Sequence, residues 1–362
     1  MHKLIATSTI LEHELSELRL LVERQTGIVL DCPNSALAAH VADYIELQSL
    51  GSSATLLERF RSSEQDPSSL PALLDGLINI NTGFFRHPGA LNALARHVVP
   101  QLCARKSVDG PTPLRIWSAG CSTGEETYTI AMAVCDALSN IAATSGNNGN
   151  GTNGGNTNGN GKSAARNGGI ADSATTSPES AKLSSSLSVH IVGSDLLPHN
   201  IETADRGVYR QSALDGLPPA TIRSYFSKIS SPSIPADIAQ NEDEVAVRPA
   251  KNGGSGGAQS TGHLLVKPRL RSLVTFNCMN LARPGYIGRF DCIFCMDVLP
   301  HFSRAQRIAL IERLHLYLEP GGYLFLSQTE KLITSNLNFR SESFDGYTFH
   351  RKPLAASAAY GR

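Results

Sequence analysis

Residues 115–133, with the sequence RIWSAGCSTGEETYTIAMA, decide the fold of this 362-residue chain. Apolar residues from Ile116 predict a buried strand, and the small residues at 118–124 predict a tight turn. The carboxylates of Glu125 and Glu126 then open an apolar pattern with helical spacing. A strand that ends in a glycine-containing turn and continues as a helix lets a cofactor approach bare backbone.

The same turn indicates the kind of cofactor. A phosphate-binding turn adds a Lys or three regularly spaced glycines, and this turn has neither. It places two carboxylates where a phosphate would require positive charge or free N–H groups. Acidic side chains suit a cofactor that carries a cation and hydroxyl groups, so S-adenosylmethionine (SAM) fits this turn better than a nucleotide phosphate.

Composition bounds the class of protein. Lys plus Arg and Asp plus Glu each number 32, so no overall basic charge indicates a nucleic-acid partner. No apolar run approaches about 18 residues, so we expect no membrane insertion, and the N-terminus lacks the pattern of a secretory signal. Seven cysteines scattered through apolar segments suit a reducing cytoplasm. We expect a cytoplasmic monomer.

The pattern divides the chain into two predicted domains, 1–85 and 86–355. The first is a small all-helical domain, in which Gly27 ends the first helix and Asn34 or Ser35 caps the second. The second helix is expected to run to about Leu47, with further helices at 53–62 and 68–78, and a helix from about Pro88 follows the domain.

Strands alternate with helices in the second predicted domain. This order predicts an α/β fold whose mostly parallel sheet is covered on both faces. Two segments, about 142–186 and 229–263, are so rich in Gly, Asn, Ser and Pro that we expect disordered insertions. The expected strands are 114–118, 188–194, 272–276, 290–295, 322–327 and 346–351, and the expected helices are 124–138 and 303–318.

Polar side chains follow two of these strands. Asp195 closes the second strand, where a carboxylate can accept hydrogen bonds from both ribose hydroxyls of an adenosine-type ligand. The alternative is a solvated Asp that caps a turn. Asn280 and Leu281 follow the third strand, where Asn280 either binds the adenine edge or only forms a turn.

A group of aromatic and polar residues precedes the sheet. Thr82, Phe84, Phe85 and Arg86 lie in NTGFFRHP at the junction between the two predicted domains. Two aromatic residues and an Arg at such a junction suggest a lid over the cleft. The alternative is that the Phe pair belongs to the core and Arg86 is a surface charge.

Two further motifs are assigned structural roles. Cys292 and Cys295 form a CxxC, but residues three apart on a strand point to opposite faces. No second pair has metal-ligand spacing, so we expect small buried residues and no metal. The segment LEPGGYLFLSQTE at 318–330 predicts a helix end, a Pro-Gly-Gly turn and a buried strand, with no catalytic role.

Four motifs together resemble the chemotaxis receptor methyltransferase family (CheR type). The family's WSAGCSTGEEPYSLAM stands here as WSAGCSTGEETYTIAM at 117–132, and its FDLIFCRNVLIYF as FDCIFCMDVLPHF at 290–302. Its LKPGGYLFLGHSESL stands as LEPGGYLFLSQTEKL at 318–332, and its NETxFFR as INTGFFR at 80–86. The resemblance covers about residues 20–352 apart from the two insertions.

The resemblance implies a Rossmann-like, SAM-dependent methyltransferase fold with a small helical N-terminal domain. It also implies methyl transfer to glutamate side chains in the cytoplasmic part of a chemoreceptor, with S-adenosylhomocysteine (SAH) as product. The catalytic candidates are Arg86, which could orient a carboxylate, and His301. The implied cofactor contacts are Thr82, Arg86, Glu125, Glu126, Asp195, Asn280, Leu281, Met296 and Asp297.

The chain departs from the family pattern in segments that would contact the acceptor. The Arg-Asn pair of the family is Met296-Asp297, and a Tyr that lies near the transferred methyl in the family is His301. The helix after Gly27 has no Lys or Arg, with His40 as its only possible cation, so steering of an acidic receptor is weakened. The family's Asn two residues before Thr82 is Ile80, and residues 229–263 do not predict the receptor-tail-binding β-hairpin, so we expect no tight tethering to a receptor tail.

Three functions remain open from the sequence. The leading one is an active protein-glutamate O-methyltransferase that acts on a chemoreceptor-like signalling protein. A second is a signalling module that binds SAM or SAH without catalysis, which the departures at Ile80, Met296, Asp297 and His301 motivate. A third is a methyltransferase with another protein or a small molecule as acceptor, which the non-basic helix motivates.

Overall fold

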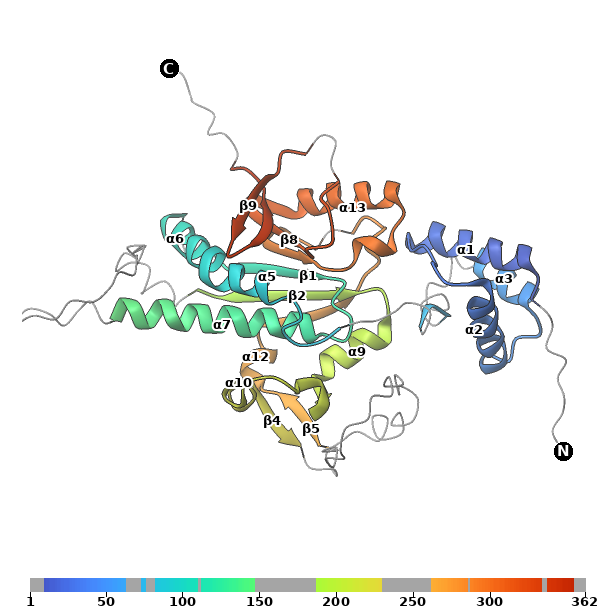
Figure 1. Cartoon of the computed structure of the whole chain (residues 1–362), viewed down its shortest axis with the longest axis horizontal. Helices are drawn as coiled ribbons and strands as arrows, with labels where there is room; N and C mark the ends of the chain where they lie inside the picture. The colour runs from blue at the N-terminus through green and yellow to red at the C-terminus, as the bar shows by residue number, and fades with distance from the viewer. Residues whose placement is uncertain are drawn as a thin grey trace, which may run out of the picture.

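The computed structural model describes residues 10–62, 73–75, 82–109, 112–146, 187–229, 262–285, 287–333 and 337–354. Its central element is a seven-stranded sheet (Figure 1). The strands are β1 (Leu114–Ala119), β2 (Val189–Asp195), β6 (Val274–Cys278), β7 (Phe290–Cys295), β8 (Leu318–Leu326), β9 (Arg340–Phe344) and β10 (Tyr347–Arg351). Their order is β6-β2-β1-β7-β8-β10-β9. The first five in this order pair in parallel, and β10 and β9 are antiparallel additions.

Helices cover both faces of this sheet. On one face lie α5 (Pro88–Ala93), α6 (Val99–Asp109) and α7 (Glu125–Gly146), with α13 (Arg304–Tyr317) on the other. Side chains alternate between the two cores as the strand period requires, so Ile116 packs with α7 and Trp117 packs with α13. Cys292 and Cys295 likewise lie in different cores, as expected. The expected α/β fold, a mostly parallel sheet covered on both faces, is confirmed.

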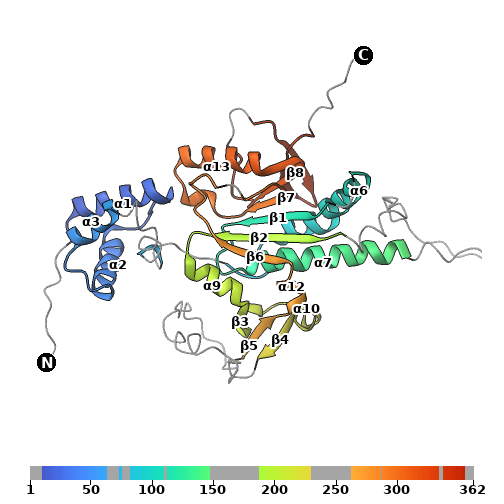
Figure 2. The same cartoon turned by 180° about the vertical axis from the view of Figure 1, so that it is seen from behind.

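The N-terminal helices form a separate layer at one end of the sheet (Figures 1 and 2). Helices α1 (Glu12–Thr26), α2 (Asn34–Leu47) and α3 (Ser53–Ser62) pack around their own apolar core. Gly27 ends α1 at φ +76°, as predicted, and Ile28 then bridges to Phe302 near the sheet. The predicted cap of α2 is wrong: Pro33 is the N-cap, because the Asn34 side chain instead accepts from Arg19.

A second sheet was not predicted. It has the order β3-β5-β4 and joins β3 (Val208–Arg210), β5 (His263–Val266) and β4 (Phe226–Ile229) in antiparallel fashion. Ile229 pairs with His263, so the two end residues of the expected insertion at 229–263 belong to strands. Nearly all the rest of that insertion, where the sequence does not predict the receptor-tail-binding hairpin, lies outside the described residues. These strands are only three or four residues long, too short for a periodic pattern to reveal. Helices α9 (Pro198–Arg206), α10 (Pro219–Tyr225) and α12 (Pro268–Arg271) lie beside this sheet.

Two other boundaries differ from expectation. Helix α7 continues to Gly146 rather than ending at 138, because Ile141 is buried against the main core. Strand β8 begins at Leu318, and its register with β7 shifts where the Pro-Gly-Gly turn was expected. Most of 142–186, 229–263 and 68–78, together with Ile80, lies outside the described residues. None of the helices in the described part combines the length and apolar character that a membrane span requires.

Candidate cofactor and acceptor site

A cavity of about 410 Å³ opens at the carboxyl ends of the parallel strands, within the roughly 300–1,000 Å³ range of small-molecule sites. Gly120 after β1, Asp195 at the end of β2, Asn280 after β6 and Met296 after β7 all line it. Ile28, next to the N-terminal helices, lines it from the side. The chain leaves β1 toward β2 on one side and β7 lies on the other, so the cavity lies at the switch point of the sheet.

The turn after β1 brings bare backbone to the cavity wall. Gly120 has φ +84°, and a Cβ there would lie 2.5 Å from Val298 Cγ2. Gly124 has φ +96°, and a Cβ there would lie 2.7 Å from the Cβ of Ala204. Since neither position can hold a side chain, the turn requires glycine at both. Of the two glycines, Gly120 lines the cavity.

Asp195 is fixed at the cavity wall by three donors. The backbone N–H of Ser122 donates to Oδ2 at 2.9 Å. The N–H of Leu197 and the side-chain amide of Asn200 both donate to Oδ1 at 3.0 Å. The carboxylate therefore joins the end of β2 to the glycine turn after β1, and its position in the cavity agrees with the prediction for this residue.

The segment before α5 contributes only part of the expected lid. Phe85 lines the cavity, but Phe84 packs edge-on against Tyr209, with ring centroids 4.9 Å apart, so Phe84 belongs to the core. Thr82 lines the cavity and donates to Glu125 Oε2 at 3.3 Å. Glu125 itself is buried and does not line the cavity. The structure thus brings Thr82 and Glu125 together, with Thr82 facing the ligand space.

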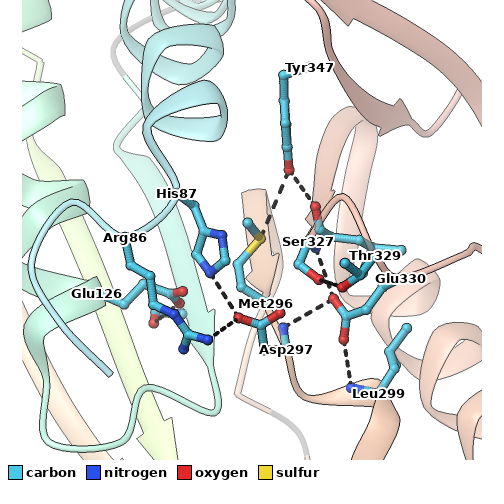
Figure 3. Close-up of polar contacts among 12 residues, drawn as sticks. Arg86, His87, Glu126, Met296, Asp297, Leu299, Ser327, Thr329, Glu330 and Tyr347 are labelled. Atoms are coloured by element: carbon cyan, nitrogen blue, oxygen red, sulfur yellow. Dashed lines mark hydrogen bonds and ion pairs between the residues drawn. The ribbon is translucent and has the colours of Figure 1, made fainter. Parts of the chain in front are cut away.

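The Arg86 side chain points toward Asp297, as Figure 3 shows, and both residues line the cavity. Its Nη2 atom lies 3.1 Å from Asp297 Oδ2, and His87 Nε2 lies 3.1 Å from the same oxygen. Burial lowers the pKa of His87, and the charge of Asp297 opposes this effect. Asp297 has φ +57°, a left-handed conformation that Asp and Asn tolerate best among residues with a side chain. His87 was not singled out from the sequence, although it directly follows Arg86.

Glu330, also missed from the sequence, holds the loop that carries Asp297 (Figure 3). Its carboxylate accepts from the backbone N–H groups of Asp297 at 3.1 Å, Leu299 at 2.9 Å and Ser327 at 2.8 Å. The motif around Glu330 was assigned an architectural role. Glu330 does have a structural role, but its carboxylate holds a wall of the cavity in place as well as the sheet. The signal in the sequence was a carboxylate shortly after a parallel strand.

The remaining predicted residues lie where expected but make other contacts. Asn280 accepts from the N–H of Ala282 at 2.9 Å and donates to the carbonyl of Gln25 at 2.8 Å, so its side chain forms a turn and joins α1 to the sheet. Leu281 and Met296 line the cavity. His301 also lines it, and burial lowers the pKa of its side chain.

The acids around the cavity suit a cationic ligand. Burial raises the pKa of Glu126 to about 7, although a 2.7 Å hydrogen bond from Ser118 opposes the effect. Burial also raises the pKa values of Glu125 and Glu330. For all three carboxylates burial outweighs the hydrogen bonds that favour the ionised form, and at Glu126 it also outweighs the charge of Arg86. Of the three, only Glu126 lines the cavity, and a sulfonium or ammonium group there would favour its ionised form, so this residue fits SAM.

In the described part of the chain, no group of three or more His, Cys, Asp or Glu side chains could hold a metal ion. Cys292 and Cys295 are buried, and burial raises both thiol pKa values far above the ordinary range. Both thiols are therefore protonated at neutral pH, which leaves them unreactive.

Comparison with known proteins agrees with this geometry. Residues 80–145 and 255–348 match the family model described as CheR methyltransferase, SAM binding domain. Chemotaxis protein methyltransferase 1 of Pseudomonas aeruginosa is 26% identical over 87% of this chain and 88% of its own length. Chemotaxis protein methyltransferase 2 of the same organism is 25% identical over 91% and 90%. That of Vibrio parahaemolyticus is 24% identical over 90% and 91%.

The match to the family model includes both the glycine turn after β1 and the loop that carries Asp297. SAM is therefore the cofactor of this site. The two relatives from Pseudomonas aeruginosa match 87% and 91% of this chain. The chain matches the SAM-binding domain of the CheR methyltransferase family and is similar to chemotaxis protein methyltransferases over about nine-tenths of its length.

Proposed function

We propose that this protein transfers the methyl group of SAM to glutamate side chains in the cytoplasmic part of a chemoreceptor or related signalling protein, and that it acts in the cytoplasm. The observation that carries the proposal is Arg86, which places a guanidinium in the cavity wall beside the acids that suit SAM. A guanidinium binds carboxylates through paired hydrogen bonds. Full-length similarity to chemotaxis protein methyltransferases supports the same acceptor.

The reaction requires little acid–base catalysis from the protein. When bound, SAM supplies a methyl group that its sulfonium already makes electrophilic. A glutamate carboxylate has a reference pKa of about 4.3, so it is ionised at neutral pH and needs no general base. The cavity has to hold the attacking oxygen in line and strip part of its water. Orientation of this kind can lower the activation barrier by roughly 7–11 kcal/mol.

Arg86 and His301 have positioning roles in this proposal. Arg86 orients a carboxylate, and Asp297 in turn fixes the guanidinium. His301 is neutral at pH 7 because burial lowers its pKa, so it can donate a single hydrogen bond without adding charge. The His301 carbonyl accepts from the N–H of Val29 at 2.8 Å, which ties the N-terminal segment to the cavity rim.

The approach of the acceptor depends weakly on charge. Helix α2 has no Lys or Arg, and His40, its one possible cation, is hydrogen-bonded at 2.8 Å to the carbonyl of Leu73. Such a surface does not steer an acidic receptor helix strongly. We therefore propose that recognition depends on shape and on the cavity more than on long-range attraction.

Asp297 favours a second candidate function. Its carboxylate already pairs with Arg86, which reduces the positive charge available to an acidic acceptor. A methyltransferase whose acceptor carries no carboxylate would not need that charge. The stability of the product separates the two candidates, because carboxyl methyl esters hydrolyse in mild base whereas N-methyl and ether products do not.

The test is transfer from methyl-labelled SAM to membranes of the source organism and to a receptor cytoplasmic fragment. The proposal predicts base-labile label in a receptor band, lost in Arg86→Ala and retained in Arg96→Ala, which changes an Arg outside the cavity lining. Base-stable label would support the second candidate. SAM binding without transfer to any acceptor would support a signalling module.

A further inference from the structure

Two buried polar atoms without partners flank Asp195 in the cavity. Asn200 is only 2% exposed, and its Oδ1 atom has no hydrogen-bond donor among the described residues. The hydroxyl oxygen of Ser122 is buried and lacks a partner in the same part of the chain. Both residues line the cavity. Buried polar groups are almost always hydrogen-bonded, so a pair of orphans beside one carboxylate indicates a polar ligand.

The orientation of the Asn200 amide follows from its neighbour. Its Nδ2 atom lies 3.0 Å from Asp195 Oδ1. An ionised carboxylate accepts hydrogen bonds only, so the amide must turn its N–H toward Asp195. The carbonyl oxygen of Asn200 is then the atom that lacks a hydrogen-bond partner among the described residues. It can only accept, so its missing partner is a donor.

The lone pairs of Asp195 do not suffice for both hydroxyls of a ribose. A carboxylate has about four acceptor positions, two on each oxygen. Oδ1 already accepts from Leu197 and Asn200, and Oδ2 accepts from Ser122. One position, on Oδ2, remains for a ligand. A ribose diol brings two donors, so one hydroxyl needs another acceptor.

We propose that Asn200 is a cofactor-binding residue that shares the ribose diol of SAM with Asp195. One hydroxyl donates to Asp195 Oδ2 and the other donates to Asn200 Oδ1. The amide of Asn200 meanwhile holds the carboxylate in place. The inference rests on the SAM cofactor and not on the identity of the methyl acceptor, so the two can fail separately.

The sequence places Asn200 well for this role. It lies in the first turn of α9, five residues after Asp195, and α9 packs against the end of β2. Helical geometry therefore fixes the side chain beside the carboxylate. The neighbouring Glu202 on the same helix is exposed and serves as a matched control position.

The test is calorimetric titration of the full chain with SAH, 2′-deoxy-SAH and 3′-deoxy-SAH, without any acceptor. Wild type and Glu202→Ala should bind each deoxy analogue about tenfold more weakly than SAH. Asn200→Ala should bind SAH about tenfold more weakly, and it should no longer distinguish SAH from one of the two analogues. That loss of discrimination is specific to a direct contact.

Three results would overturn the proposal. The first is that Asn200→Ala weakens all three ligands by the same factor, because the residue would then only orient Asp195. The second is that Asn200→Ala binds SAH like wild type. The third needs no variant: wild type binds both deoxy analogues as tightly as SAH. Should Asn200→Ala melt early in the absence of ligand, Asn200→Ser provides the same comparison with a smaller change.

Discussion

Nη2 of Arg86 lies 3.1 Å from Oδ2 of Asp297, which places an ion pair inside the cavity at the strand ends. The family motif has Asn where this chain has Asp297. Both residue types tolerate the φ of +57° found here, so the exchange changes charge and leaves the backbone unaltered. The consequence is an Arg86 whose charge is partly used within the protein.

Asp297→Asn should therefore release Arg86 toward an acidic acceptor. The side chains of Arg86 and Asp297 are about one-third exposed (36% and 30%), so the pair contributes at most about 1 kcal/mol. We expect KM for a receptor fragment to fall by about two- to fivefold. Steady-state kinetics measure this, with Asp345→Asn, another Asp at positive φ but outside the cavity, as control. A rise in KM would show that the pair helps the acceptor to bind.

SAM binding should depend on pH through Glu126. Its pKa is raised to about 7 without cofactor, and a cationic ligand favours the ionised form. Binding thus releases a proton, so affinity should rise with pH up to about 7 and level off above it. Calorimetry between pH 6 and pH 8 tests this. Glu126→Gln should remove the slope and weaken binding, whereas an unchanged slope would assign it to another group.

The same residue should cost stability when the cofactor is absent. A carboxyl whose folded pKa lies above its unfolded value destabilises the fold as pH rises from the unfolded value through the folded one. Above pH 7 the penalty is complete and is on the order of 1–3 kcal/mol for a shift of this size. Relative to wild type, Glu126→Gln should therefore raise Tm at pH 8 and lower it only slightly, or not at all, at pH 5. Equal Tm values at pH 8 would contradict the shifted pKa.

Glu330→Ala should loosen the loop that carries Asp297. Three backbone N–H groups lose their acceptor, and Leu299 and Ser327 are buried. Loss of these bonds should lower the free energy of unfolding by about 2–4 kcal/mol. Urea denaturation measures the loss, and Glu330→Gln, which keeps one acceptor oxygen, should recover part of it. Wild-type stability in Glu330→Ala would show that water replaces the carboxylate.

His301 should affect turnover more than cofactor affinity. It stands where the family has a Tyr near the transferred methyl, and its pKa is lowered by burial. His301→Ala should reduce kcat by about tenfold with SAH affinity nearly unchanged, and His301→Tyr should restore activity. Single-turnover rates and calorimetry on the same preparations separate the two quantities. A parallel loss of SAH affinity would place His301 at the cofactor instead.

The sheet and one half of the site follow from local sequence. The strand–turn–helix at 115–133 predicts β1, the glycine turn and Glu126, and Asp195 follows because it closes a strong apolar strand. Strands β3, β4 and β5 were not predicted because each is three or four residues long and because a low-complexity segment separates β4 from β5. Strand β9 was not predicted because RSESF is a polar edge strand without an alternating apolar pattern.

The other half of the site depends on contacts between distant segments. His87, just before α5, contacts Asp297, just after β7, and Glu330 reaches the loop after β7 from the loop after β8. No local pattern reports such pairs. The number of ligand hydroxyls from which Asp195 can accept hydrogen bonds could not be predicted from the sequence either, because it depends on which neighbours already donate to this carboxylate. The division into domains at residue 85 stays a prediction.

The central claim is methyl transfer to a glutamate carboxylate with Arg86 as the orienting cation. Its most direct test is mass spectrometry of a receptor cytoplasmic fragment after incubation with the protein and SAM bearing a deuterated methyl group. We predict a base-labile label on glutamate side chains, abolished in Arg86→Ala and present in Arg96→Ala. A label on any other residue type, or an equal yield from Arg86→Ala, would contradict it.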